Sequence, residues 1–169
     1  MAKHDYAERF HAGTLTDGWR WFGSHPDKKN GAEGWTFRVW APHAQSVCVV
    51  GDFNSWIDGV HPLTRDGEIW EGFIPGLGEY TSYKYAVTGP DGEVRLKTDP
   101  YAFHCETRPA TAGKLYNIEG FKWTDAAFLA KQEKHQVYES PLNIYEVHLG
   151  SWKKRPNGDF YDYKDMAKE

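Results

Sequence analysis

Few side chains in this sequence could do acid, base or metal chemistry. Glu146 and His148 stand two positions apart on the segment Asn143–Trp152, an apolar run that predicts a buried strand. Charged groups on such a strand are usually paired for structural reasons, and a direct role with a substrate is the alternative. The eight histidines form no His-Glu-x-x-His motif and no cluster with a cysteine. We therefore expect no metal site and no cofactor.

Aromatic residues are the other candidates, because they are unusually frequent. The chain of 169 residues holds eight Trp, ten Tyr and nine Phe, which together make 16% of it. Large flat side chains at that density suit a β-rich core, and they equally suit a surface on which sugar rings stack. Composition alone does not separate these two roles.

Charge and hydropathy exclude several classes of function. The formal net charge is −4 and the basic residues are scattered except for Lys153-Lys154-Arg155, which predicts a solvated loop rather than a nucleic-acid surface. The first ten residues lack an apolar signal segment, and no run of eighteen apolar residues occurs, so we expect neither secretion nor a membrane partner. Cys48 and Cys105 are too isolated for a disulfide framework. A reduced, cytoplasmic setting is the prediction.

The elements that must position these side chains are mostly short strands. Residues 1–19 read as a short N-terminal helix or arm, and from Trp35 the apolar period changes to two. The predicted strands are Trp35–Trp40, Val47–Val50, Ile69–Ile74, Tyr83–Val87 and Val94–Leu96. Short strands at even spacing, with Gly and Pro turns between them, indicate an antiparallel β-sandwich over residues 20–118.

A second, incomplete architecture is expected after the sandwich. Residues 119–140 read as a linker with a helix at Ala126–Gln136, which Thr124 or Asp125 would cap. Residues 141–169 then give the strand at Asn143–Trp152, a long loop and a helix capped by Asp162. A buried strand followed by a helix is the first βα unit of a (β/α)8 barrel, whose eight units need about 250 residues. The predicted fold class is thus mainly β, with a truncated barrel start.

Four stretches, which together span nearly the whole chain, resemble the N-terminal part of 1,4-α-glucan (glycogen) branching enzymes. They are Phe37–Pro42, Val50–Trp56, Leu96–Phe103 and Ile144–Trp152. The first two are similar to motifs of any family-48 carbohydrate-binding module, including those of debranching enzymes and kinase β-subunits. The last two, with Glu106–Pro109 between them, point to branching enzymes.

The resemblance implies an immunoglobulin-like module that leads into the α-amylase-type barrel of glycoside hydrolase family 13. Enzymes of that family cut an α-1,4-glucan with retention, using carboxyl groups about 5 to 5.5 Å apart, and a branching enzyme passes the cut chain to a 6-hydroxyl to make an α-1,6 branch. The catalytic carboxylates come from later barrel strands. We therefore expect no catalytic residue in this chain, an α-1,4-glucan or glycogen partner, and a barrel of the full-length protein as its other partner.

The same resemblance implies three glycan-binding residues. Trp56 matches the position at which such modules stack a glucose ring, and Lys84 and Asn117 match two further sugar-contacting positions. The alternative role for Trp56 is structural, as a tryptophan that closes the sandwich. The alternative for Lys84 and Asn117 is that both are solvated polar residues. One departure stands out, because a second stacking tryptophan should fall near Val94–Leu96 and no aromatic residue is there.

A rival hypothesis is a free-standing glycan-binding or regulatory module, like a kinase β-subunit domain. It explains residues 20–118 but gives residues 143–169 no purpose, because a lone barrel strand buries nothing. Its exposed apolar side chains would favour aggregation or demand a partner.

Overall fold

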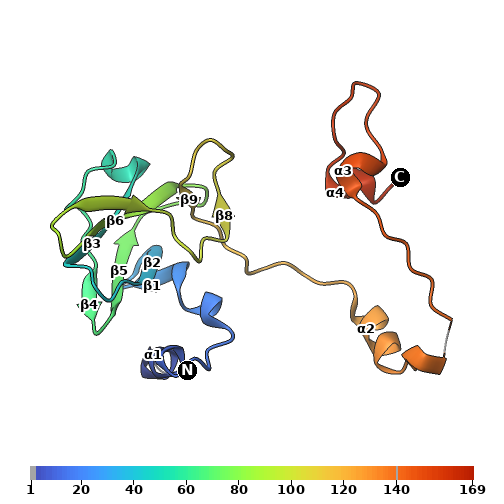
Figure 1. Cartoon of the computed structure of the whole chain (residues 1–169), viewed down its shortest axis with the longest axis horizontal. Helices are drawn as coiled ribbons and strands as arrows, with labels where there is room; N and C mark the ends of the chain where they lie inside the picture. The colour runs from blue at the N-terminus through green and yellow to red at the C-terminus, as the bar shows by residue number, and fades with distance from the viewer. Residues whose placement is uncertain (1–2, 140) are drawn as a thin grey trace. The chain divides into compact units, whose positions relative to one another are not determined.

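The computed structural model describes residues 3–139 and 141–169, and the chain divides into two units, Met1–Phe121 and Lys122–Glu169 (Figure 1). The strands are β1 (Gly23–Lys29), β2 (Ala32–Trp40), β3 (Ser46–Gly51), β4 (Thr64–Asp66), β5 (Ile69–Pro75), β6 (Ser82–Thr88), β7 (Val94–Lys97), β8 (His104–Cys105) and β9 (Gly113–Lys114). The helices are α1 (Lys3–His11), α2 (Ala126–Glu133), α3 (Leu149–Trp152) and α4 (Tyr163–Met166), with 3-10 turns η1 (Gly18–Arg20), η2 (Asp52–Asn54) and η3 (Val137–Glu139).

The first unit is built from two antiparallel sheets. One has the strand order β1-β2-β5-β4, and the other has the order β3-β6-β9-β8 with β7 paired to β6. The turn between β1 and β2 is Asn30-Gly31, whose φ angles of 51° and 83° are those of a two-residue hairpin turn that matches the twist of the strands. The prediction of a mainly β, sandwich-like fold is confirmed, and an immunoglobulin-like arrangement fits it.

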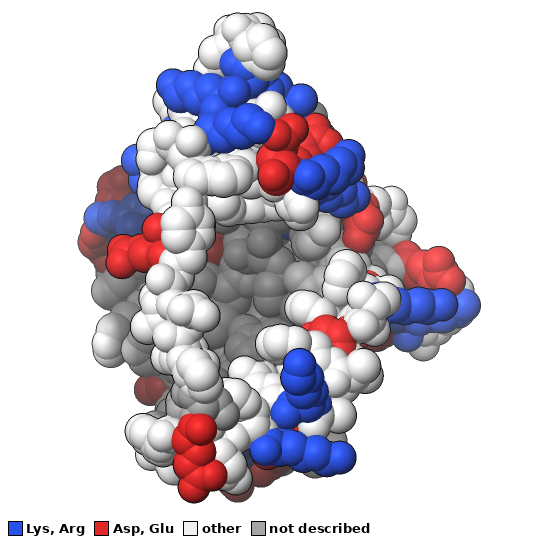
Figure 2. Space-filling view, turned by 90° about the vertical axis from the view of Figure 1, so that its right-hand side faces the viewer, with Lys and Arg blue, Asp and Glu red and all other residues white. Residues whose placement is uncertain are grey.

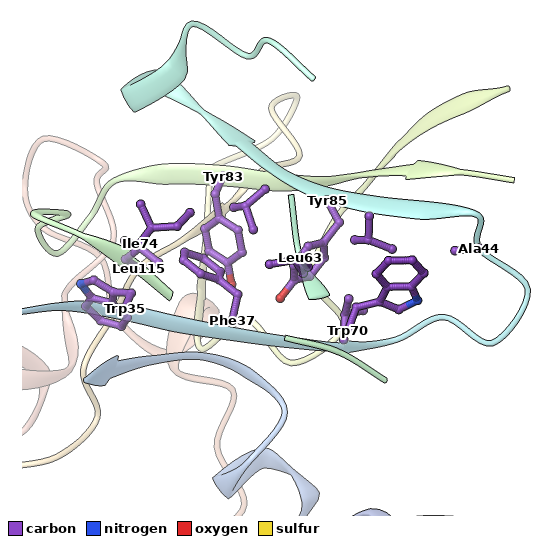
Figure 3. Close-up of a cluster of buried hydrophobic side chains, with 12 residues drawn as sticks. Trp35, Phe37, Ala44, Leu63, Trp70, Ile74, Tyr83, Tyr85 and Leu115 are labelled. Carbon is purple, nitrogen blue, oxygen red and sulfur yellow. The ribbon is translucent and has the colours of Figure 1, made fainter. Parts of the chain in front are cut away.

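The core of this unit lies between the two sheets. Figure 3 shows Tyr83 and Tyr85, both fully buried on β6, pointing towards the aromatic side chains of the first sheet. The ring centroids of Phe37 and Tyr83 are 5.2 Å apart and edge to face, an arrangement that adds about 1 kcal/mol beyond the buried area. Part of the aromatic richness of the sequence therefore has a structural cause, because Trp35, Phe37, Trp70, Tyr83 and Tyr85 fill the space between the sheets.

Helix α1 covers a second, smaller cluster. Tyr6 and Phe10 pack against buried Trp21, Phe22 and Ile69. The rings of Tyr6 and Trp21 are stacked, with centroids 5.4 Å apart and planes 10° from parallel. Because its apolar residues find these partners, the predicted N-terminal helix forms, and it begins three residues before Tyr6.

The second unit differs from the prediction. The expected strand at Asn143–Trp152 is wrong in this structure: residues 141–148 form no regular element, and Leu149–Trp152 is the short helix α3. A barrel strand takes its hydrogen bonds from neighbouring strands. Within the described residues no strand pairs with this segment, and Ile144 is 82% exposed. The helix that Asp162 was expected to cap does form, because the Asp162 carboxylate accepts a hydrogen bond of 2.8 Å from the Asp165 amide.

Charged side chains of both signs are interspersed on the face of the molecule that Figure 2 draws. On the face drawn in Figure 2, basic and acidic side chains occur side by side with no extended basic area. Among residues 3–139 and 141–169, no helix is both long and apolar enough to cross a membrane.

Candidate functional site

The outward side of the second sheet carries the first candidate site. Cross-strand pairs place Cys48 opposite Ala86, Val50 opposite Lys84, and Ala86 opposite Leu96. Paired residues point to the same side of a sheet, so these five side chains form one surface, which we call the outer face. The alternate residues of the same strands, such as Val49 and Tyr85, fill the core.

Trp56 is placed on the outer face by the tight turn that follows β3. Ser55 and Trp56 both have left-handed φ angles, 54° and 61°, which non-glycine residues seldom adopt. The Asn54 side chain holds the turn, because its Oδ1 accepts from the Gly51 amide at 2.9 Å and its Nδ2 donates to the Val49 carbonyl at 2.9 Å. The strain is thus offset by a buried amide with three partners.

Only glycine fits at the point where this turn leaves the strand. A Cβ atom on Gly51 would lie 2.3 Å from the Ser82 carbonyl oxygen and 2.5 Å from Phe53 Cε1. The backbone oxygen cannot move aside without breaking the ladder between β3 and β6. Gly51 therefore fixes the course of the chain into Trp56.

The turn lays the Trp56 side chain against the sheet. Trp56 packs on Cys48, Val50 and Ala86 and remains half-buried, and its indole Nε1 donates to Asp52 Oδ1 at 3.0 Å. Burial raises the pKa of the Cys48 thiol, so this side chain supports the indole as a neutral, apolar group. The indole ring is thus held by the sheet residues on which it packs and by the Asp52 carboxylate at its edge. Part of its surface stays exposed to solvent.

Lys84 lies on the same face, next to Val50. Its Nζ donates to Thr111 Oγ1 at 2.7 Å, and its side chain is half-buried. Thr111 is held in turn, because its carbonyl oxygen accepts from Thr98 Oγ1 at 2.5 Å. The outer face thus carries an ammonium group and a half-exposed indole, a hydrogen-bond donor and an apolar plane, which is the chemistry that binds a polyhydroxylated ring.

Asn117 lies elsewhere. It follows β9 by three residues and lines a cavity with Tyr6, Trp19 and His25, none of which belongs to the outer face. Its Oδ1 accepts from the Glu119 amide at 2.9 Å, and its own amide donates to Glu79 Oε1 at 2.9 Å. The structure therefore places Trp56 and Lys84 on the same face of the sheet, and Asn117 at a different cavity.

Sequence reasoning missed several residues of the outer face. Thr111 and Asp52 give no signal in the sequence, because their roles are to hold Lys84 and Trp56 through contacts that only the fold creates. Leu96 could have been assigned to the outer face from the sequence, because side chains along β7 point alternately to the two sides of the sheet. It is 52% exposed and stands where a second aromatic residue was expected.

The remaining sequence candidates concern a metal site and the pair Glu146 and His148. In the part of the chain that the structure describes, no group of three or more His, Cys, Asp or Glu side chains could hold a metal ion. Glu146 and His148 sit on the segment that forms no strand, and His148 Nδ1 lies 2.8 Å from Ser151 Oγ within its own helical turn.

Comparison with known proteins defines the class first. Residues 21–102 match the family model of carbohydrate-binding module 48, the isoamylase N-terminal domain. The matched range covers seven of the nine strands, from β1 to β7. Residues 21–102 are therefore similar to this class of carbohydrate-binding module, and the outer face lies within that range.

The particular relatives are branching enzymes. The chain is 49% identical over 160 residues to the 1,4-alpha-glucan branching enzyme GlgB of Bacillus subtilis (strain 168), an alignment that covers 94% of this chain and 26% of that protein. It is 47% identical over 162 residues to the enzyme of the same name from Geobacillus stearothermophilus, covering 95% of this chain and 25% of that protein. The predicted resemblance to the N-terminal region of branching enzymes is confirmed. The chain spans about a quarter of the length of these relatives.

Among solved structures, the pullulanase from Bacillus acidopullulyticus matches 57% of this chain and 12% of its own, with a TM-score of 0.45 and 25% identity.

Proposed function

We propose that residues 20–118 are a glucan-holding module of a glycogen branching enzyme, and that the chain by itself does not catalyse. The observation that carries the proposal is the outer face, where a half-exposed Trp56 and a positioned Lys84 lie on a carbohydrate-binding module. The ligand would be an α-1,4-glucan chain such as glycogen. Trp56 would stack on a glucose ring and Lys84 would donate to its hydroxyl groups.

Asn117 takes a different part in this proposal. It lies at a cavity away from Trp56 and Lys84, so one short glucan segment on the outer face does not require it. We keep it as a glycan-binding residue at that second place.

Maltoheptaose titration of the 169-residue chain tests the outer face. Trp56→Ala removes the stacking surface and should weaken binding about tenfold, which corresponds to about 1.4 kcal/mol. Trp56→Phe should recover part of it, and Lys84→Met, which keeps the apolar stem, should weaken binding several-fold. Trp40→Ala serves as control, because Trp40 is a 46% exposed indole at the end of β2. An unchanged affinity in Trp56→Ala would remove Trp56 from the site.

We also propose that residues 119–140 link the module to a catalytic barrel that begins in residues 141–169, after the N-terminal arm 1–19 and the module. The alignment with branching enzymes supports this, because it covers 94% of the chain and so extends well beyond the family-48 match. The second unit also holds an open apolar groove of about 280 Å³, lined by Tyr145, Val147, Leu149, Trp152, Tyr163, Met166 and Ala167. We expect later elements of the barrel to pack on this apolar surface and bury it. The same continuity favours the branching enzyme over a free-standing regulatory module.

Hydrogen exchange distinguishes these two assignments. Amides of residues 143–149 should exchange rapidly in the 169-residue chain, and slowly in a full-length branching enzyme that contains this sequence. Rapid exchange in both would contradict the barrel assignment.

The 169-residue chain should not branch amylose, and measurable branching would refute its non-catalytic role. The two free cysteines agree with a reduced, cytoplasmic setting.

A further inference from the structure

One feature of the first unit that the outer face does not explain is the cavity at which Asn117 lies. It has a volume of about 230 Å³ and is lined by residues from α1, η1, β1, the segment between β7 and β8, and the segment after β9. Among them are Tyr6, Trp19, Arg20, His25, Phe103 and Glu119. No residue of the outer face contributes to it, so it is a separate place on the module.

One wall of the cavity is aromatic and held in a fixed orientation. Phe103 meets Trp19 edge to face, with ring centroids 6.2 Å apart, and it meets His25 in the same way at 5.6 Å. The Arg20 guanidinium carbon lies 4.6 Å from the centre of the Trp19 ring. With these contacts made, Trp19 is still 39% exposed. A fixed and partly open indole is a stacking surface for the CH face of a sugar ring.

The other groups are hydrogen-bonding, and their charges balance. His25 Nε2 lies 2.9 Å from the Phe22 carbonyl oxygen and so donates to it, and burial lowers the pKa of His25, which leaves Nδ1 as an acceptor. Asn117 uses its oxygen to bind the Glu119 amide, so its NH₂ group faces other partners as a donor. Arg20 and Glu119 bring one positive and one negative charge. An anionic ligand binds best where positive charge is in excess, whereas a neutral polyhydroxylated ligand needs no excess charge. The balanced charges of the cavity therefore favour the neutral ligand.

We propose that this cavity is a second glucan-binding site, which takes a single glucose residue of an α-glucan between Trp19 and Asn117. The inference deepens the function proposed above and depends on it for the class of ligand. The volume lies below the roughly 300 to 1,000 Å³ of pockets that bind drug-sized ligands, which limits the site to about one sugar ring. Two separated contacts would let the module hold a long chain at two points, which raises its apparent affinity for glycogen over that for maltose.

The test follows the indole N–H signals of Trp19 and Trp56 by NMR in the 169-residue chain during titration with maltose and with inorganic phosphate. Maltose should shift the Trp19 signal, and it should do so in Trp56→Ala as well. Phosphate should not shift it. A Trp19 signal that responds to phosphate and ignores maltose would overturn the proposal.

Two variants address the site without depending on one another. Trp19→Ala should weaken maltose binding at the cavity about tenfold, measured by NMR on the other residues that line the cavity. Trp40→Ala should leave that binding unchanged. Asn117→Asp keeps the oxygen that accepts from Glu119 and removes the NH₂ donors, so it should weaken binding with the local turn intact. Unchanged binding in both variants would refute the site.

The two proposals fail in different ways. If the Trp56 signal responds to maltose and the Trp19 signal does not, the second site is wrong and the outer face stands. If only the Trp19 signal responds, the outer face is wrong. If neither responds to maltose or to maltoheptaose, both proposals fall together.

Discussion

Asp99 is a carboxyl group buried beside the core, with 4% of its surface exposed. The Tyr83 hydroxyl lies 2.6 Å from Asp99 Oδ2 and 3.0 Å from Ser24 Oγ. That hydroxyl has one proton, which it gives to the carboxylate, so it can accept from Ser24. The Tyr85 hydroxyl donates to the same oxygen at 3.1 Å, and the Tyr101 amide donates to Oδ1 at 2.8 Å. Through these bonds Asp99 ties β6 of the second sheet to β1 of the first.

Burial raises the pKa of Asp99 above its usual range, although the hydroxyl and amide donors oppose the rise. The folded state therefore binds the proton at a pH at which the unfolded state has released it. The stability that comes from protonation is fully present below the unfolded pKa and is lost as the pH rises through the folded pKa. Between those two pKa values it changes by about 1.4 kcal/mol per pH unit.

Asp99→Asn should remove this pH dependence. We expect the free energy of unfolding of the natural chain, minus that of the variant, to rise as the pH falls from 7 towards 4. Urea unfolding at several pH values measures it. Asp27→Asn is the control, because the hydrogen bond from Thr36 lowers the pKa of Asp27, so its stabilisation is lost only as the pH falls below the unfolded pKa of about 3.9 and its difference should stay nearly flat from pH 7 to 4. A difference for Asp99→Asn that stays flat with pH would contradict the assignment.

At the scale of elements, the pair of β2 and β5 depends on one ion pair across the strands. Arg38 and Glu71 are directly opposite each other, with Nε and Oε2 2.6 Å apart and side chains only 17% and 19% exposed. Arg38 also donates to the Trp21 carbonyl oxygen at 3.2 Å and lies over the Trp21 ring at 5.5 Å. The arginine thus joins the ladder to the segment that carries the second apolar cluster.

Arg38→Ala should lower the free energy of unfolding by about 2 kcal/mol, because it leaves the Glu71 carboxylate largely desolvated beside the ladder. Arg95→Ala is the control. Arg95 pairs with Asp91 at 2.6 Å, but both side chains are about half exposed, at 49% and 50%, so the loss should stay below about 1 kcal/mol. Chemical denaturation of the three proteins compares them. Equal losses in the two variants would show that the buried position of Arg38 adds nothing.

The elements that could be predicted from sequence are those whose apolar pattern matches their final surroundings. Strands β2, β3, β5 and β6 were predicted because each has side chains in the core, whereas β7 was predicted from the alternation of Val94 and Leu96 although all four of its residues are exposed. Strand β1 was missed, because Gly23–Lys29 is polar and contains Pro26, and it is held by its ladder with β2 at the edge of the sheet. The strand at Asn143–Trp152 was wrong for the converse reason, since an apolar run becomes a strand only where neighbouring strands exist.

The site was predictable only in part, for similar reasons. A motif placed Trp56 after a strand, but the left-handed turn that presents it arises from the side-chain bonds of Asn54 and the close approach at Gly51. The distance between Asn117 and the other two residues could not be read from the sequence, because the chain beyond β9 leaves the sheet. The cavity beside Trp19 is formed by five segments of the chain, so no local sequence pattern predicts it.

At the scale of the whole molecule, the two units differ in how they are held. The first has its apolar side chains inside two sheets, with only 0 to 8% of each core residue exposed. In the second, α2 has no buried residue, and Met166 is the one buried apolar side chain among the described residues. The segment around α2 also carries exposed Lys122, Lys131 and Lys134. Local opening should therefore cost much less there than in the sandwich.

Limited trypsin digestion of the 169-residue chain should cut first at Lys131 or Lys134, because a protease needs an extended, accessible backbone that the ladders at Arg38 and Lys84 do not offer. Mass spectrometry of the early fragments identifies the cuts. The N-terminal product should keep its thermal midpoint within about 4 °C, the shift that 1 kcal/mol causes in a domain of this size. It should also bind maltoheptaose as the intact chain does, since both candidate sites lie before residue 122. First cuts within the β-strands, or a product that has lost its unfolding transition, would mean that the sandwich depends on the second unit.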